Sequence, residues 1–71
     1  MASVYQIRVE GYLEERWSHW FDDLRLTHHN DGTTTLSGPV ADQTALHGLL
    51  AKVRDLNLTL ISVIRVEPAS V

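Results

Sequence analysis

The sequence predicts an α+β fold, because strand-like and helix-like segments follow one another in the order β-α-β-β-α-β. Three patterns carry this prediction: strict alternation near the N-terminus, two apolar stripes at helical spacing, and a glycine-containing turn between two strand-like segments. The chain has 71 residues, 44% of them hydrophobic, which is enough for one small core. We therefore expect a single domain over residues 1–71.

The first strand is predicted over Val4–Glu10, where Tyr5, Ile7 and Val9 share one face of a period-2 pattern. Gly11 is expected to end this strand. A short helix of about two to three turns is predicted to follow, because apolar residues then recur at helical spacing. The apolar stripe of this helix consists of Leu13, Trp17, Trp20, Phe21 and Leu24.

A β-hairpin is predicted in the middle of the chain. Leu24–His29 alternates, and Asn30–Gly32 supplies residues that tolerate positive φ. The segment Thr33–Ser37 returns as a strand because it is rich in β-branched side chains. Gly38 and Pro39 are expected to end the hairpin.

The second helix is predicted over Gln43–Leu56, with Asp42 as its N-cap and Asn57 as the left-handed residue that follows it. The last strand is predicted over Leu58–Glu67, before Pro68. Short connections and right-handed crossovers then favour a ferredoxin-like sandwich. Its antiparallel sheet would have the strand order 4-1-3-2, with both helices on one face.

Charge and composition exclude several classes of function. Six Lys and Arg residues stand against nine Asp and Glu residues, which gives a net charge of -3, and the basic residues are scattered along the chain. Nucleic acid and anionic membranes are therefore not expected partners.

The sequence has no cysteine, so chemistry based on thiolates is absent. It shows neither a signal peptide nor a membrane span, which predicts a cytoplasmic protein, and no motif calls for a cofactor.

The last strand carries more apolar surface than one sheet face can bury. One parity holds Leu58, Leu60, Ile64 and Val66, and the other holds Ile61 and Val63, so both faces of this strand are largely apolar. An apolar strand at a sheet edge predicts self-association. The expected interface consists of Val4, Arg8, Leu58, Leu60, Ile61, Val63 and Ile64.

Catalytic and metal-binding signals are weak. His28 and His29 are adjacent on a predicted strand, so their side chains would point to opposite faces and could not share one ion. A metal site would require His28 from several chains. The acidic pairs at 14–15 and 22–23 are interpreted as helix ends. The leading prediction is a non-enzymatic, homo-oligomeric interaction or small-ligand-binding module that assembles through the last strand and the open face of the sheet.

An alternative from another class is a small cofactor-independent enzyme of the dimeric α+β barrel type. In that case a histidine and aromatic side chains would line a pocket between sheet and helices. The candidate ligand-binding residues are Trp20, His28 and His47.

The stretch Leu36–Leu56, preceded by Asp31–Thr35 and followed by Leu58–Val63, resembles a group of small bacterial and archaeal proteins usually called hypothetical. The resemblance covers Tyr5–Glu67 and implies the same α+β domain. It implies no activity, because none is established for that group.

Two ferredoxin-like families are similar in part. Val9–Arg16 resembles the phosphate-binding loop of acylphosphatases, which implies Arg16 and Asn30 as catalytic candidates. Carboxylates at positions 14 and 15 would repel the phosphate, and the second glycine of that loop is missing. Gly48–Val63 resembles the helix and strand of ACT-type regulatory domains, whose Asp-x-Pro-Gly opening this chain lacks. That likeness implies pairing through sheet edges and small-molecule binding at the interface.

Overall fold

In the computed structural model, residues 3–66 form a four-stranded antiparallel sheet with two helical segments. The remaining terminal residues, including Glu67 and Pro68 at the end of the predicted last strand, lie outside the described part of the chain. The elements are β1 (Ser3–Glu10), the 3-10 helix η1 (Glu15–Phe21), β2 (Arg25–His28), β3 (Thr33–Val40), α1 (Gln43–Asp55) and β4 (Leu60–Val66).

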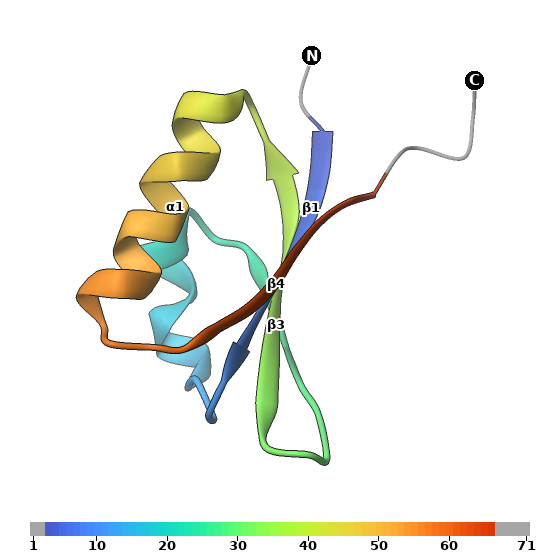
Figure 1. Cartoon of the computed structure of the whole chain (residues 1–71), viewed down its shortest axis with the longest axis vertical. Helices are drawn as coiled ribbons and strands as arrows, with labels where there is room; N and C mark the ends of the chain where they lie inside the picture. Colours follow the sequence, from blue (N-terminus) through green and yellow to red (C-terminus); the bar gives the residue numbers. More distant parts are fainter. Residues whose placement is uncertain (1–2, 67–71) are drawn as a thin grey trace.

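The sheet has the strand order β2-β3-β1-β4, which read from the other edge is β4-β1-β3-β2. Each neighbouring pair of strands is antiparallel. Figure 1 shows α1 and the turns of η1 on the same side of the sheet. We call that side the covered face and the opposite side the open face. The small α+β architecture expected from the sequence is therefore confirmed.

The core lies between the covered face and the two helices. Tyr5, Ile7 and Val9 are all buried, as their alternation predicts, and α1 buries Leu46, Leu49 and Val53 against them. The complete set of buried apolar side chains is Tyr5, Ile7, Val9, Leu13, Phe21, Leu24, Leu26, Leu36, Val40, Leu46, Leu49 and Val53. The buried strand residues belong to β1, β2 and β3. From β4, Val63 is only partly buried against this core.

The first helix differs from its prediction. It is a 3-10 helix of seven residues, and Leu13 and Leu24 lie outside it although both are buried. Its end is tight because Asp22 and Asp23 both adopt positive φ and the Asp23 amide donates to the Ser18 carbonyl at 2.8 Å.

The third strand is longer than predicted. It continues through Gly38 and Pro39 to Val40, whereas the sequence suggested that the hairpin ends at Ser37. The pairing with β2 stops at Ser37, opposite Arg25, so beyond that point β3 has a neighbour only on its β1 side. A proline is tolerated there because no second strand requires its missing N–H.

The second helix confirms its predicted signals. The Asp42 carboxylate accepts a hydrogen bond from the Ala45 amide at 2.8 Å, and Asn57 has φ 59. The helix ends at Asp55, one residue before the predicted end. β4 starts at Leu60 rather than Leu58, because the Leu58 amide donates to the Val53 carbonyl at 3.1 Å and keeps that residue in the helix-strand connection.

The expected facing of the last strand is wrong in part. A register shift between Arg8 and Val9 of β1 places Leu60 opposite Val9 and Val63 opposite Ile7. Leu60 and Val63 therefore share the covered face, although the uninterrupted alternation assigned them to opposite faces. A bulge of this type adds one residue to one strand and inverts the parity beyond it.

Candidate functional site

The open face of the sheet is mainly polar. Paired residues on this face include Gln6 with Ser37 and Arg8 with Thr35. Together with neighbours from β2 and β4 they form a shallow hollow of ≈ 270 Å³. Its walls are Gln6, Arg8, Thr27, His29, Thr35, Ser37, Ser62 and Ile64. Four hydroxyl groups, an amide, an imidazole and a guanidinium thus meet on one surface.

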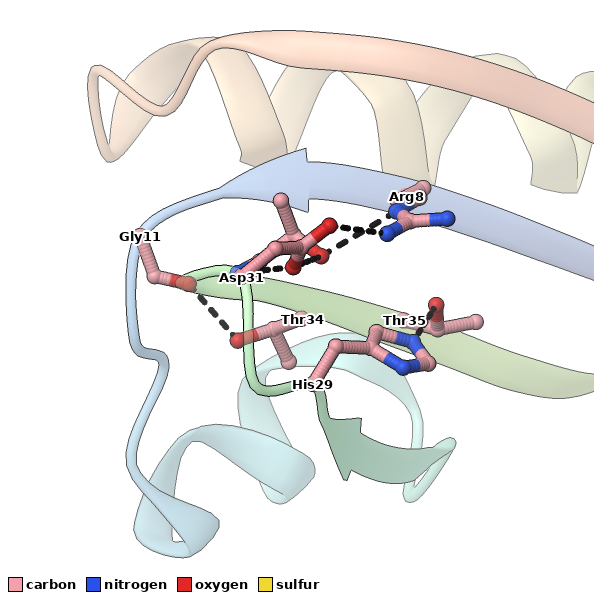
Figure 2. A network of polar contacts seen from close by, with 7 residues as sticks. Arg8, Gly11, His29, Asp31, Thr34 and Thr35 are labelled. Atoms are coloured by element: carbon pink, nitrogen blue, oxygen red, sulfur yellow. Dashed lines mark hydrogen bonds and ion pairs between the residues drawn. The ribbon is translucent and has the colours of Figure 1, made fainter.

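A polar network holds the arginine of this hollow in place (Figure 2). Arg8 donates through Nη2 to Asp31 Oδ2 at 2.6 Å and through Nε to Thr33 Oγ1 at 3.1 Å. Asp31 Oδ1 in turn accepts from the hydroxyl and the backbone amide of Thr33, at 2.6 and 3.1 Å. The hairpin turn and β1 are therefore joined through side chains, and the direction of the guanidinium is fixed by two acceptors.

The Asp31 carboxylate is stabilised in its charged form. The hydrogen bond from the Thr33 hydroxyl, followed by the Thr33 amide and the positive charge of Arg8, lowers the pKa of Asp31 below its ordinary value. Partial desolvation opposes these effects but does not outweigh them. Asp31 and Arg8 consequently remain an ion pair through the neutral range.

His29 lies on the open face next to Thr35, and their Nε2 and Oγ1 atoms are 2.7 Å apart. His28 turns the other way: its Nε2 contacts the Leu13 carbonyl oxygen at 2.5 Å. The ring of His28 also stacks on Tyr12, with centroids 4.0 Å apart. The two adjacent histidines thus point to opposite sides of the sheet, as the strand pattern predicts.

Thr34 anchors the loop that follows β1. Its side chain is fully buried, donates to the Gly11 carbonyl at 2.7 Å and accepts from the Leu13 amide at 3.1 Å. Figure 2 shows the contact with Gly11 at the end of β1. The loop is therefore positioned by the covered face and leaves the open face unobstructed.

The three residues predicted to bind a ligand lie on three different elements. Trp20 is exposed on η1 with Lys52 Nζ 5.7 Å from its ring centre, His28 lies at the end of β2, and His47 is exposed on α1. None of the three lines either of the two surface hollows described, of which the second lies at Arg16 and Trp17. The enzyme hypothesis built on them stays a prediction.

The predicted interface residues fall into three groups. Leu60, Ile61 and Ile64 of β4 are exposed by 44%, 47% and 52%, and Val4 is exposed on the adjacent β1. Leu58 and Val63 instead pack against the core. The last member, Arg8, is half-buried in the hollow.

The acylphosphatase resemblance finds little support in this geometry. Arg16 is exposed and pairs with Glu14, its Nη2 lying 3.0 Å from Oε1. Asn30 lies in the turn between β2 and β3. Within residues 3–66, no group of three or more His, Asp or Glu side chains is arranged to hold a metal ion. No helix in that part of the chain is long and apolar enough to cross a membrane.

The polar hollow was not predicted from the sequence, although a signal was present. Gln6 and Arg8 alternate with buried residues on β1, and Thr35 and Ser37 do so on β3. Polar residues on the outer parity of two adjacent strands indicate a solvated sheet face. Their alignment depends on the register between β1 and β3, which the sequence does not reveal.

Comparison with known proteins assigns the chain to a family. Residues 4–64 match the family model described as Domain of unknown function (DUF8691), and the chain belongs to this family. The resemblance to an uncharacterised group of small proteins is thereby confirmed. No curated protein and no solved structure matches the chain.

Proposed function

We propose that this chain is a non-enzymatic module that forms a homodimer through the β4 edge of its sheet and serves as an interaction or small-ligand-binding unit. The observation that carries the proposal is the exposure of Leu60, Ile61 and Ile64 on an edge strand, at 44%, 47% and 52%. An edge strand presents backbone N–H and C=O groups to any strand that approaches it.

The two edges of the sheet support this choice of surface. β2 has four residues, two of them Arg25 and His28, and such a short polar edge is poorly suited to pairing. β4 has seven residues, no proline and one charged side chain, that of Arg65. Of the features with which monomeric proteins block edge-to-edge pairing, β4 has Arg65 and the bulge against β1, but it is longer and more apolar than β2.

A second copy of the same chain fits this edge. An antiparallel pair of identical strands is self-complementary about a two-fold axis, so one patch satisfies both partners. Pairing β4 with its copy would extend the sheet, with Leu60 adding apolar contact on the covered face and Ile64 on the open face. A small domain without disulfides gains stability from such an added apolar contact.

The proposal includes a ferredoxin-like assignment and a cytoplasmic location. The order β4-β1-β3-β2, the antiparallel neighbours and the two helical segments on one side support the fold assignment. The net charge of -3 and the scattered basic residues support protein or small-molecule partners rather than nucleic acid or membrane.

The test is the mass of the intact chain by native mass spectrometry at several protein concentrations. We expect a dimer that the substitution Ile61→Asp converts to a monomer, because a desolvated carboxylate at the new interface has no partner. Thr44→Asp, which adds the same charge on the exposed start of α1, should leave the dimer intact. Ile61→Lys repeats the test with opposite charge, and circular dichroism confirms folding. The proposal would be contradicted by a monomeric wild-type chain, or by a dimer that persists in both Ile61→Asp and Ile61→Lys.

A further inference from the structure

The open face of the sheet changes in polarity along the strands. The register forms a row of Ser62, Arg8, Thr35 and Thr27, and one step further a row of Ile64, Gln6, Ser37 and Arg25. The next row consists of Val66, Val4 and Pro39. Successive rows on one face are about 6.7 Å apart, because each is two residues further along a strand. Along β1 the face thus changes from the Arg8 guanidinium to Ile64 and then to Val66, Val4 and Pro39, while Arg25 adds a second guanidinium at the β2 edge of the middle row.

The guanidinium of Arg8 retains donor capacity. Nε and Nη2 donate to Thr33 and Asp31, and within residues 3–66 no acceptor contacts Nη1. The side chain is 39% exposed, so a molecule in the hollow can reach it. Since two acceptors already hold the guanidinium in place, binding would cost little side-chain entropy.

The walls of the hollow favour an anionic group near Arg8. None of the residues that line it is acidic, and Asp31, which is not among them, occupies the Nη2 side of the guanidinium. Hydroxyls of Ser62 and Thr35 flank the arginine in the same row. Hydrogen bonds between a carboxylate and a guanidinium are charge-assisted and directional.

We propose that the open face binds a small amphipathic carboxylate, with its carboxylate at Arg8 and its apolar end directed along β1 toward Ile64 and Val4. The exposed side chains of Val4 and Ile64, at 38% and 52%, give the apolar end a surface to cover. A volume of ≈ 270 Å³ suits a ligand smaller than most drug-sized molecules. The hollow shares Ile64 with the proposed β4 interface, but Gln6, Arg8, Thr35 and Ser37 belong to β1 and β3 and take no part in pairing at the β4 edge.

The experiment is a titration of the full chain, labelled with ¹⁵N, with acetate, butanoate, hexanoate and the neutral hexanamide, followed by amide chemical shifts. We expect hexanoate to bind more tightly than acetate and to shift the amides of β1, β3 and β4 around the hollow. Hexanamide should bind at least about tenfold more weakly than hexanoate, because it lacks the charge-assisted contact.

Three variants locate the site. Arg8→Gln should weaken hexanoate binding about tenfold or more, whereas Arg54→Gln on α1 removes the same charge on the far side of the sheet and should not change it. Ser37→Leu fills the hollow without touching the Arg8 network and should also abolish binding, which keeps the test valid if the first variant unfolds. Equal affinity for hexanoate and hexanamide, unchanged binding by either hollow variant, or shifts centred on Trp17 and Trp20 would overturn the proposal.

Discussion

The covered and open faces of the same sheet differ in burial and in polarity. On β1 and β3, the covered face presents Ile7, Val9 and Leu36, of which none is more than 1% exposed. The open face of the same two strands presents Gln6, Arg8 and other polar groups that remain accessible. Stability is therefore concentrated on one side of the sheet, and the other side can carry a binding surface at little cost to folding.

Adjacent threonines give the sharpest test of this difference. Thr34→Val removes a hydroxyl that satisfies both the Gly11 carbonyl and the Leu13 amide on the covered face. We expect a loss of about 1–3 kcal/mol in the free energy of unfolding, because both backbone groups lose their partner. Urea denaturation of the wild type and of Thr34→Val measures this loss of free energy.

Thr35→Val is the control on the open face. The Thr35 hydroxyl contacts His29 on the open face, where water can replace the hydroxyl as a partner. The free energy of unfolding should therefore change by less than about 0.5 kcal/mol. Equal effects of the two substitutions would show that the faces do not differ in the way described.

Two glycines test whether the covered face is filled. A Cβ added at Gly38 would lie 2.6 Å from Leu24 Cδ2, which is buried in the core. Gly38→Ala should therefore destabilise the protein by about 1–3 kcal/mol, because the added methyl group overpacks against Leu24 and because Gly38 has φ 157, which residues other than glycine rarely adopt. The measurement is the midpoint of thermal unfolding together with the urea midpoint.

Gly48→Ala is the matched control, because nothing lies within 4 Å of a Cβ at that position of α1. Alanine favours the helix over glycine, so this variant should be more stable by about 0.5–1 kcal/mol. Opposite signs for the two substitutions support the close contact with Leu24 together with the glycine-specific backbone of Gly38, and a neutral Gly38→Ala would contradict both.

The smallest expected effect concerns the ion pair at the rim of the open face. The pKa of Asp31 is lowered in the folded protein from an ordinary value of 3.8, first by the Thr33 hydroxyl. A carboxyl group with a lowered folded pKa stabilises the protein above its unfolded pKa, and this contribution is lost as the pH falls through the folded value. The stability of the wild type relative to Asp31→Asn should therefore decline below pH 3.8.

Urea denaturation at pH about 6 and about 2.5 measures this decline. Asp55→Asn removes a carboxylate outside the network and controls for the general change in net charge. A difference between wild type and Asp31→Asn that is the same at both pH values would contradict the role assigned to the Thr33 and Arg8 contacts.

Some features followed from local sequence because their causes are local. The alternation of Tyr5, Ile7 and Val9 defined a half-buried strand, and Asp42 and Asn57 marked the ends of α1. Capping and φ preference depend on a few neighbouring residues, and period-2 burial requires only that one face of a strand meets a core. The sequence by itself therefore determined the order of the elements and the core side of β1.

Tertiary structure decided the features that depend on more than one segment. Pro39 remains in β3 because β2 ends before it, and the bulge against β1 puts Leu60 and Val63 on the same face. The hollow around Arg8 exists only because the register between strands aligns Gln6 with Ser37. Register is set by the packing of the whole sheet, so residues far apart in the sequence meet at positions that no single segment specifies.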